Sequence, residues 1–258
     1  MSGPLRSFAQ PGDAGPDVLG ADWPIFRGDP TLGGVSASSL PESIKLLWSF
    51  ETESEPSSPV IAGGRVVVAT RDGDLISLDL ALGKPVWRTK VEAGFEAAPT
   101  CTSELVLISD FQGVVHARSL ADGTNVWSHQ TPEEAEIKAS VAVASKTAIV
   151  GSYDGTLHAL NLTDGAKRWT HQSDAQIHAT CAVADGLVYV AGCDGHFRGI
   201  EVTSGTVKVD IPFGGYTAAS PAIRDGVAIF GTFSNDVVAI DIARKALVWR
   251  YTPKKLFP

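Results

Sequence analysis

The sequence contains few cysteines and no paired cysteine motif. Cys101, Cys181 and Cys193 are the only three among 258 residues, and no two of them have Cys-x-x-Cys spacing. An odd number without that spacing argues against a disulfide framework and against a structural zinc site. Each cysteine lies in a strand-like run of small and apolar residues, so we interpret all three as small buried side chains.

Long apolar runs are also absent. No stretch of about 18 consecutive apolar residues occurs, so we predict no transmembrane segment. The N-terminal stretch "MSGPLRSFAQPGDAGPD" lacks the apolar centre of a secretory signal, and we therefore expect no signal peptide in the chain as written. Residues 1–22 are rich in Gly, Pro, Asp and Ser, a composition that predicts disorder.

Positive charge is scarce. Lys and Arg number 21 against 29 Asp and Glu, which gives a formal net charge of -8. Binding to nucleic acid or to an anionic membrane surface depends on an excess of basic side chains. Proteins and small molecules are therefore the expected partners.

A unit of about 40 residues recurs along the whole chain. Its marker position is occupied, at intervals of 39 to 42 residues, by Trp48, Trp87, Trp127, Trp169, Val209 and Trp249. Phrases such as "SLDLALGKPVW" precede this position, and strand-like runs such as "GGRVVVAT" lie further upstream. Between these runs stand Asp-Gly and similar pairs, which are strong hairpin signals.

Four short strands in each repeat, without a helical period, predict an all-β fold: a β-propeller of four-stranded antiparallel blades. We place the leader at residues 23–43 and the propeller at 44–258, with one stray strand, "KLLWSF", ahead of the first repeat. The five repeats are predicted to span residues 49–88, 89–128, 129–170, 171–210 and 211–250.

The recurring tryptophan is predicted to cover the seam between blades, and a glycine four residues earlier to form a tight positive-φ turn. Two repeats depart from the pattern, because Val209 replaces the tryptophan and Lys245 replaces the glycine. The predicted blade-docking residues are Trp48, Trp87, Trp127, Trp169, Trp249, Gly83, Gly123, Gly165 and Gly205.

The phrase formed by Ser77, Asp79, Gly83, Lys84 and Trp87 resembles the tryptophan-docking repeat of the pyrroloquinoline-quinone (PQQ) propeller superfamily. This resemblance covers residues 44–252 and implies a propeller that usually has eight blades. We therefore expect an incomplete arc, with unpaired edges, from a truncated bacterial member of the family. The superfamily contains quinoprotein dehydrogenases as well as scaffolds and sensor domains that bind no cofactor.

No catalytic, cofactor-binding or metal-binding residues can be assigned. The calcium ligands and adjacent cysteines that the resemblance implies for a quinoprotein have no counterpart, so no cofactor is expected, and PQQ with calcium is the alternative. The six histidines are scattered. His116 and His158 hold the same place in consecutive repeats, which favours a structural position in a strand over a ligand.

One place remains for binding: the segments that enter the innermost strands and line one mouth of the central channel. Aligning the repeats puts Ser57, Ala97, Lys138, His178 and Ala219 at one equivalent position. We hypothesise that Lys138 and His178 contact an anionic ligand, against the alternative of a solvated funnel of mixed charge. The candidate mouth residues are Glu55, Glu96, Glu136, Lys138, Gln176, His178 and Tyr216.

The leading functional hypothesis is a non-catalytic propeller that binds protein partners or a ligand, with an envelope assembly as its expected setting. A quinoprotein alcohol or sugar dehydrogenase with cofactor ligands in missing blades is the alternative, and the sensor domain of a signalling protein is a third. The resemblance implies a periplasmic or envelope location.

Overall fold

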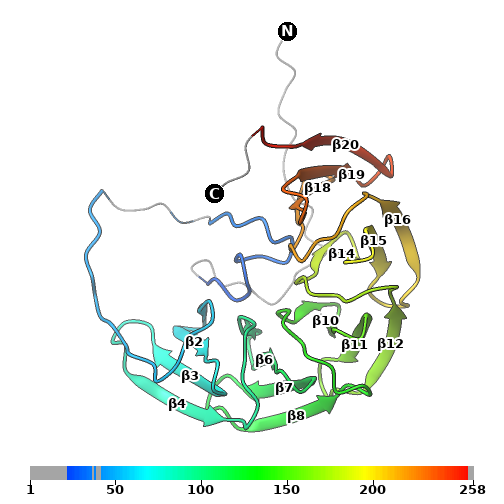
Figure 1. Ribbon diagram of the computed structural model, residues 1–258. Coiled ribbons are helices and arrows are strands. Elements are labelled where there is room, and N and C mark those ends of the chain that lie inside the picture. The colour runs from blue at the N-terminus through cyan, green and yellow to red at the C-terminus, as the bar shows by residue number, and fades with distance from the viewer. Residues whose placement is uncertain (1–21, 37, 39–41, 255–258) are drawn as a thin grey trace.

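The computed structural model describes residues 22–36, 38 and 42–254, and every regular element in them is a β-strand. Twenty strands form five four-stranded sheets that follow one another around an open arc (Figure 1). The predicted β-propeller is therefore confirmed. Apart from Asp22, the segment predicted to be disordered lies outside the described residues.

Each sheet is one blade, built from four consecutive strands. Blade 1 contains β1 (Val60–Ala62), β2 (Arg65–Ala69), β3 (Asp74–Asp79) and β4 (Pro85–Lys90). Blade 2 contains β5 (Thr100–Cys101), β6 (Leu105–Ser109), β7 (Val114–Ser119) and β8 (Asn125–Gln130). Blade 3 contains β9 (Ala142–Ala144), β10 (Thr147–Gly151), β11 (Thr156–Asn161) and β12 (Lys167–Gln172). Blade 4 contains β13 (Ala182–Ala184), β14 (Leu187–Ala191), β15 (His196–Glu201) and β16 (Val207–Pro212). Blade 5 contains β17 (Ala222–Arg224), β18 (Val227–Gly231), β19 (Val237–Asp241) and β20 (Ala246–Tyr251).

All neighbouring strands within a blade are antiparallel, and the third and fourth strands share one irregularity. In every blade their register shifts by one residue immediately beside the partner of the repeat's marker position, as between Ala159 and Leu160 in blade 3. An extra residue of this kind bends the strand and increases its twist. The bulge therefore lies where the outermost strand presents its tryptophan.

Four of the marker tryptophans dock on the blade that follows them rather than on the turn of their own repeat. Trp127 of blade 2 donates a hydrogen bond from Nε1 to the Leu162 carbonyl of blade 3 at 2.9 Å. Its ring covers Gly165, where a Cβ atom would lie 2.6 Å from the indole. Equivalent Nε1 bonds join Trp48 to Leu80, Trp87 to Leu120 and Trp169 to Val202. Glycine is thus needed at the turn for its positive φ and for the close approach of the indole.

The two departures from the repeat pattern face each other across one seam. Val209 of blade 4 stands where a tryptophan would dock on blade 5, and Lys245 occupies the turn position where glycine would receive it, at a φ of 52°. Lys245 instead donates from Nζ to the Lys208 carbonyl at 2.8 Å. Aromatic rings fill this seam, with Phe213 edge-on to Phe230 at 5.0 Å between centroids. The marker tryptophan and the glycine that would receive it are therefore both replaced at the same seam.

The prediction of a stray strand around Trp48 is wrong. Residues 44–50 form no strand, because no second and third strand of a preceding blade lies beside them within the described residues. The Trp48 ring nevertheless packs against Gly83, as its equivalents do in later blades. At the other end of the arc, the Trp249 side chain is 44% exposed, compared with 6% for Trp127.

The leader crosses the centre of the arc along the innermost strands (Figure 1). Trp23 pairs with Ile61 of β1, and the Cys101 amide donates to the Pro24 carbonyl at 2.7 Å. Val183 and Ile223 donate to the carbonyls of Pro30 and Thr31 in the same way. The leader therefore joins four innermost strands and lies across the centre of the arc.

Candidate functional site

The structure changes the alignment of the mouth residues in two blades. Four backbone bonds fix the register, from the amides of Phe111, Tyr153, Cys193 and Phe233 to the carbonyls of Gly94, Glu136, Gln176 and Tyr216. The residues two positions after these four carbonyls hold equivalent places in their blades, and they are Glu96, Lys138, His178 and Ala218. Ser57 holds the same place in blade 1. The sequence alignment with Ala97 and Ala219 was therefore wrong by one residue, because blades 2 and 5 begin one residue out of step.

Lys138 lies at the centre of a compact polar cluster. Its Nζ atom is 3.3 Å from a carboxylate oxygen of Glu136 and 4.0 Å from one of Glu96. The same ammonium lies over the ring of Tyr153, 4.8 Å from its centroid. The Tyr153 hydroxyl is hydrogen-bonded to Nδ1 of His178. Five candidate or neighbouring side chains from blades 2, 3 and 4 thus form one connected group.

The electrostatics of this cluster argue against the predicted anion site. Burial opposes the charged form of Lys138, but hydrogen bonds to Glu136 and Tyr153 outweigh it and raise its pKa. Burial lowers the pKa of His178, and the positive charge of Lys138 adds to this effect while Glu96 opposes it. His178 is therefore neutral near pH 7, and two carboxylates already surround the lysine charge.

Glu96, Lys138 and His178 line a cup of about 210 Å³ at the channel mouth. Phe26 of the leader also lines the cup, together with hydroxyl side chains that join neighbouring blades. The Ser140 amide donates to the Thr180 hydroxyl at 3.0 Å, and the Thr180 amide donates to the Ser220 hydroxyl at 3.0 Å. Hydrogen bonds from backbone amides to side-chain hydroxyls thus connect neighbouring blades along the wall of the cup.

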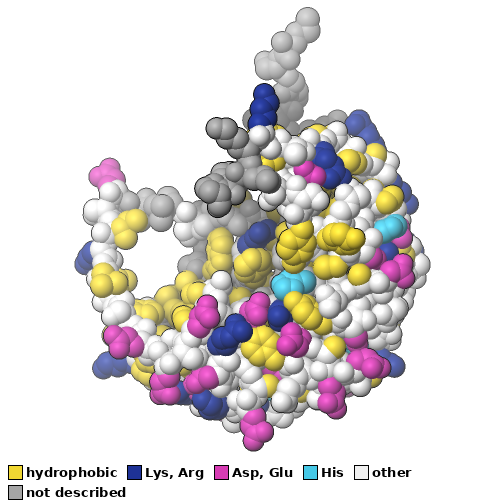
Figure 2. All heavy atoms as spheres, viewed as in Figure 1, with side chains coloured by type: hydrophobic (Ala, Val, Ile, Leu, Met, Phe, Trp, Pro, Cys, Tyr) yellow, Lys and Arg dark blue, Asp and Glu magenta, His cyan; other side chains and the backbone are white. Residues whose placement is uncertain are grey.

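The remaining mouth candidates lie outside the hydrogen-bonded cluster. Glu55 and Gln176 are exposed at the ends of their connections. The Tyr216 side chain is 67% exposed, beside Phe233 at 68%. Figure 2 shows a histidine near the centre of this face, next to basic and acidic side chains, with hydrophobic side chains beside it. This pair of exposed aromatic residues was not found by sequence reasoning, which did not single out Phe233.

His116 and His158 each face a turn carboxylate inside their own blades. Nε2 of His116 is 2.8 Å from a carboxylate oxygen of Asp110, and His158 faces Asp154 at 3.9 Å. Arg198 holds the equivalent place in blade 4 and pairs with Asp194. A position that is taken by arginine in a third blade and pairs with a turn carboxylate serves to stabilise the hairpin.

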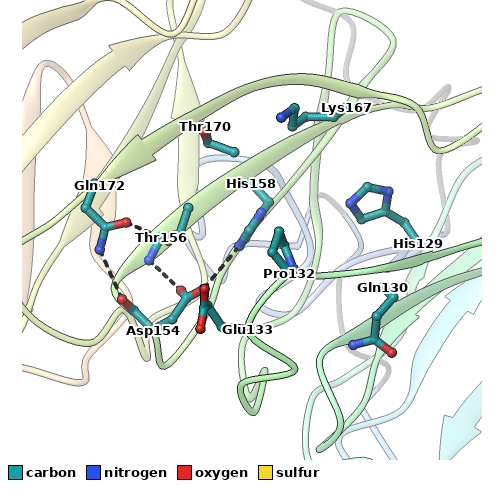
Figure 3. A pocket seen from close by; sticks show the side chains of 10 residues that line it. All are labelled: His129, Gln130, Pro132, Glu133, Asp154, Thr156, His158, Lys167, Thr170 and Gln172. Atoms are coloured by element: carbon teal, nitrogen blue, oxygen red, sulfur yellow. Dashed lines mark hydrogen bonds and ion pairs between the residues drawn. The ribbon is translucent and has the colours of Figure 1, made fainter.

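A groove of about 670 Å³ between blades 2 and 3 contains His158 and His129 (Figure 3). His158 points toward Asp154 from the groove wall, while His129 lies apart from both. Burial lowers the pKa of His158 and outweighs the opposite effect of Asp154. The two histidines are therefore neutral groups that do not converge on a common point.

One acidic cluster could hold a metal ion by spacing alone: Glu53, Asp72 and Asp74. Arg88 binds Asp74 through two hydrogen bonds of 2.8 and 2.6 Å and also contacts Glu53. Lys90 pairs with Asp72 at 3.1 Å. Since the carboxylates are already paired with two cations, this cluster is a network of ion pairs.

The cysteines are separate thiols. Burial raises the pKa of Cys181 to about 12, and burial together with Asp22 does the same for Cys101. Cys193 is half-buried and donates to the Thr217 carbonyl.

No helix long and apolar enough to cross a bilayer occurs in the part of the chain that the structure describes.

A family model described as outer membrane protein assembly factor BamB matches residues 35–140 and again residues 111–255. The chain belongs to this family of PQQ-like repeat propellers. The BamB proteins of Nitrosomonas eutropha and Xanthomonas campestris are 28% and 33% identical to it, over 86 residues each. These alignments cover 33% and 30% of this chain, and 21% of each relative. The matched part is thus about a fifth of each curated relative's length.

Solved structures share the PQQ-like propeller fold. BamB from Moraxella catarrhalis superposes with a TM-score of 0.70 at 22% identity, over 79% of this chain and 66% of that one. A quinohemoprotein alcohol dehydrogenase from Comamonas testosteroni gives 0.77 at 13% identity, covering 90% and 49%. A europium-containing methanol dehydrogenase gives 0.79 at 10% identity, covering 90% and 58%. Because scaffolds and enzymes both superpose, this likeness establishes the fold alone.

Proposed function

We propose that this chain is a non-catalytic, protein-binding propeller that engages its partner through the channel-mouth face. The observation that carries the proposal is the exposure of Tyr216 and Phe233 together on that face, beside the cup. Large aromatic side chains are enriched where proteins bind one another, and contiguous exposed apolar surface often marks an interaction site. Hydrogen bonds between neighbouring blades hold the wall of the cup in place, which lowers the entropy lost on binding.

The family supports an assembly role in the cell envelope. The matching family model and the curated relatives carry the name outer membrane protein assembly factor. We extend this role to the present chain as a proposal, with a periplasmic or envelope location. Fractionation of cells that express the full-length protein tests the location, and recovery in the cytosol alone would contradict it.

The mouth residues do not fit PQQ. This quinone carries carboxylates, so its site needs cations that are free to pair with them. Lys138 is the cation in the cup, and Glu136 and Glu96 already surround it. His178 is neutral because burial lowers its pKa. An anionic quinone placed here would face the two glutamates, so the geometry favours a binding role.

Site-specific photocrosslinking in the native host tests the proposed function. A photoreactive residue at Tyr216 reports on the mouth, and one at Glu104, in the exposed turn between β5 and β6, reports on the opposite face. We expect Tyr216 to yield a discrete polypeptide adduct that mass spectrometry identifies reproducibly, and Glu104 to yield none. Equal labelling from both faces, or no adduct from the mouth, would refute the proposal.

A further inference from the structure

The exposed aromatic pair and the cup belong to one end of the propeller, and the connections that surround them are predominantly acidic. Five connections enter the innermost strands at this end, at residues 51–58, 91–98, 131–140, 173–180 and 213–220. They contain nine acidic side chains and one basic one, Lys138. The acidic residues are Glu51, Glu53, Glu55, Glu92, Glu96, Glu133, Glu134, Glu136 and Asp174.

The opposite end has no such imbalance. Its ten turns join the first strand of each blade to the second and the third to the fourth, and they contain five acidic and four basic side chains. The acidity of the mouth is therefore a local property and does not simply follow from the net charge of -8. A face of this kind attracts a partner of opposite charge and orients it before contact.

The cup offers a place for one basic side chain. The Glu96 carboxylate is 40% exposed and accepts no hydrogen bond from the residues that the structure describes. Its 4.0 Å contact with the Lys138 ammonium is longer than a hydrogen bond, so the hydrogen-bonding capacity of this carboxylate is unused. A guanidinium can bind a carboxylate through two parallel hydrogen bonds, whereas an anion would meet Glu96 and Glu136. Phe26 of the leader lines the cup, and the cup's volume of about 210 Å³ suits a single side chain.

Tyr216 and Phe233 supply the apolar part of the same surface. Tyr216 stands two residues before Ala218, which lines the cup, and the Tyr216 carbonyl accepts a hydrogen bond from the Phe233 amide. Arginine and lysine stems pack on aromatic faces, and their charges are attracted to the ring. Arg71 already lies over the Phe111 ring in this way, at 5.5 Å from its centroid.

We propose that the mouth face binds an extended segment of a partner protein that carries arginine or lysine. One basic side chain enters the cup beside Glu96, and the flanking residues of the segment pack on Tyr216 and Phe233. This inference rests on the proposed protein-binding function and adds the chemistry of the partner.

Titration calorimetry with the whole chain and three short synthetic peptides tests it. The peptides share an alternating leucine framework and carry arginine, glutamine or glutamate at the intervening positions. We expect the arginine peptide to bind, the glutamine peptide to bind at least about tenfold more weakly, and the glutamate peptide not to bind. The affinity for arginine should fall as salt rises from about 0.05 to 0.3 M.

Matched variants locate the site. Glu96→Gln and Tyr216→Ala should each weaken binding of the arginine peptide by about fivefold or more. Glu104→Gln and Leu82→Ala, both in exposed turns at the opposite end, should leave the affinity unchanged. All four side chains are substantially exposed, so folding is expected to be retained, and circular dichroism checks it.

Equal or tighter binding of the glutamate peptide would overturn the inference, as would wild-type affinity in both mouth variants. Failure of the peptides alone does not decide the proposed function. If the Tyr216 photoprobe still gives its specific adduct while the arginine peptide fails to bind, the charge assignment is wrong and protein binding stands. If neither is observed, both proposals fail.

Discussion

The close approach of Trp127 to Gly165 predicts that two glycine substitutions with similar backbone conformations will differ greatly in cost. Gly165 has a φ of +70°, and a Cβ there would lie 2.6 Å from the Trp127 ring. Gly186, in the turn between β13 and β14, has a φ of +74° and nothing within 4 Å of an added Cβ. Gly186→Ala therefore reports the backbone cost alone, and Gly165→Ala reports that cost and the displaced indole.

The magnitudes follow from these contacts. Alanine in the left-handed region costs about 1–2 kcal/mol at either position. At Gly165 the indole must also move, which breaks its 2.9 Å bond to the Leu162 carbonyl, worth about 1 kcal/mol. Part of the burial of Trp127 is lost as well, out of about 3–5 kcal/mol for complete truncation of such a ring. We expect Gly165→Ala to cost about 2–3 kcal/mol more than Gly186→Ala.

Urea unfolding followed by tryptophan fluorescence and by circular dichroism measures both variants. The excess cost should disappear in a Trp127→Ala background, because the added methyl group then meets no indole. Equal destabilisation by the two glycine variants would refute the docking argument. So would an undiminished cost of Gly165→Ala after Trp127 has been removed.

Three further predictions use the same contacts. Trp127→Ala should destabilise the protein by about 3–5 kcal/mol and Trp249→Ala, whose ring is exposed, by less than about 1 kcal/mol; equal losses in urea unfolding would contradict the role of the seam. Val209→Trp and Lys245→Gly should each be neutral or destabilising alone. The double variant should be more stable by about 1 kcal/mol or more than the sum of the two single effects predicts. Additive effects would contradict the pairing of the two positions across the seam. Burial lowers the pKa of His158 in the folded protein, so the stability that its neutral form contributes is complete above about pH 6.5 and is lost as the pH falls toward that lower pKa. His158→Gln should therefore reduce the dependence of the unfolding free energy on pH over that range. An unchanged pH dependence would argue against this assignment.

The repeat pattern alone predicted most of the fold, because it reports on contacts that recur in each blade. Hairpin turns and the spacing of the tryptophans were sufficient to place the strands of all five sheets. The pattern could not show which glycine each indole covers, since that contact joins two different repeats. The pairing of Val209 with Lys245 was missed for the same reason, although the two departures are 36 residues apart, close to one repeat.

The mouth was harder to predict than the fold, because irregular segments of unequal length enter the innermost strands. A shift of one residue in blades 2 and 5 placed Ala97 and Ala219, instead of Glu96 and Ala218, beside Lys138 and His178. Sequence position also gave no sign that Tyr153 joins these two side chains. The charge imbalance of the connections was visible in the sequence, but its meaning depended on knowing that all of them meet at one end.

Amide hydrogen exchange of the whole chain, with and without the polypeptide crosslinked through Tyr216, tests most directly the claim that the mouth is the binding face. We predict slower exchange at residues 91–98, 131–140 and 213–220, and unchanged exchange in the turns at 102–105, 145–147 and 185–187. Protection confined to those turns, with the three mouth connections unaffected, would contradict the claim.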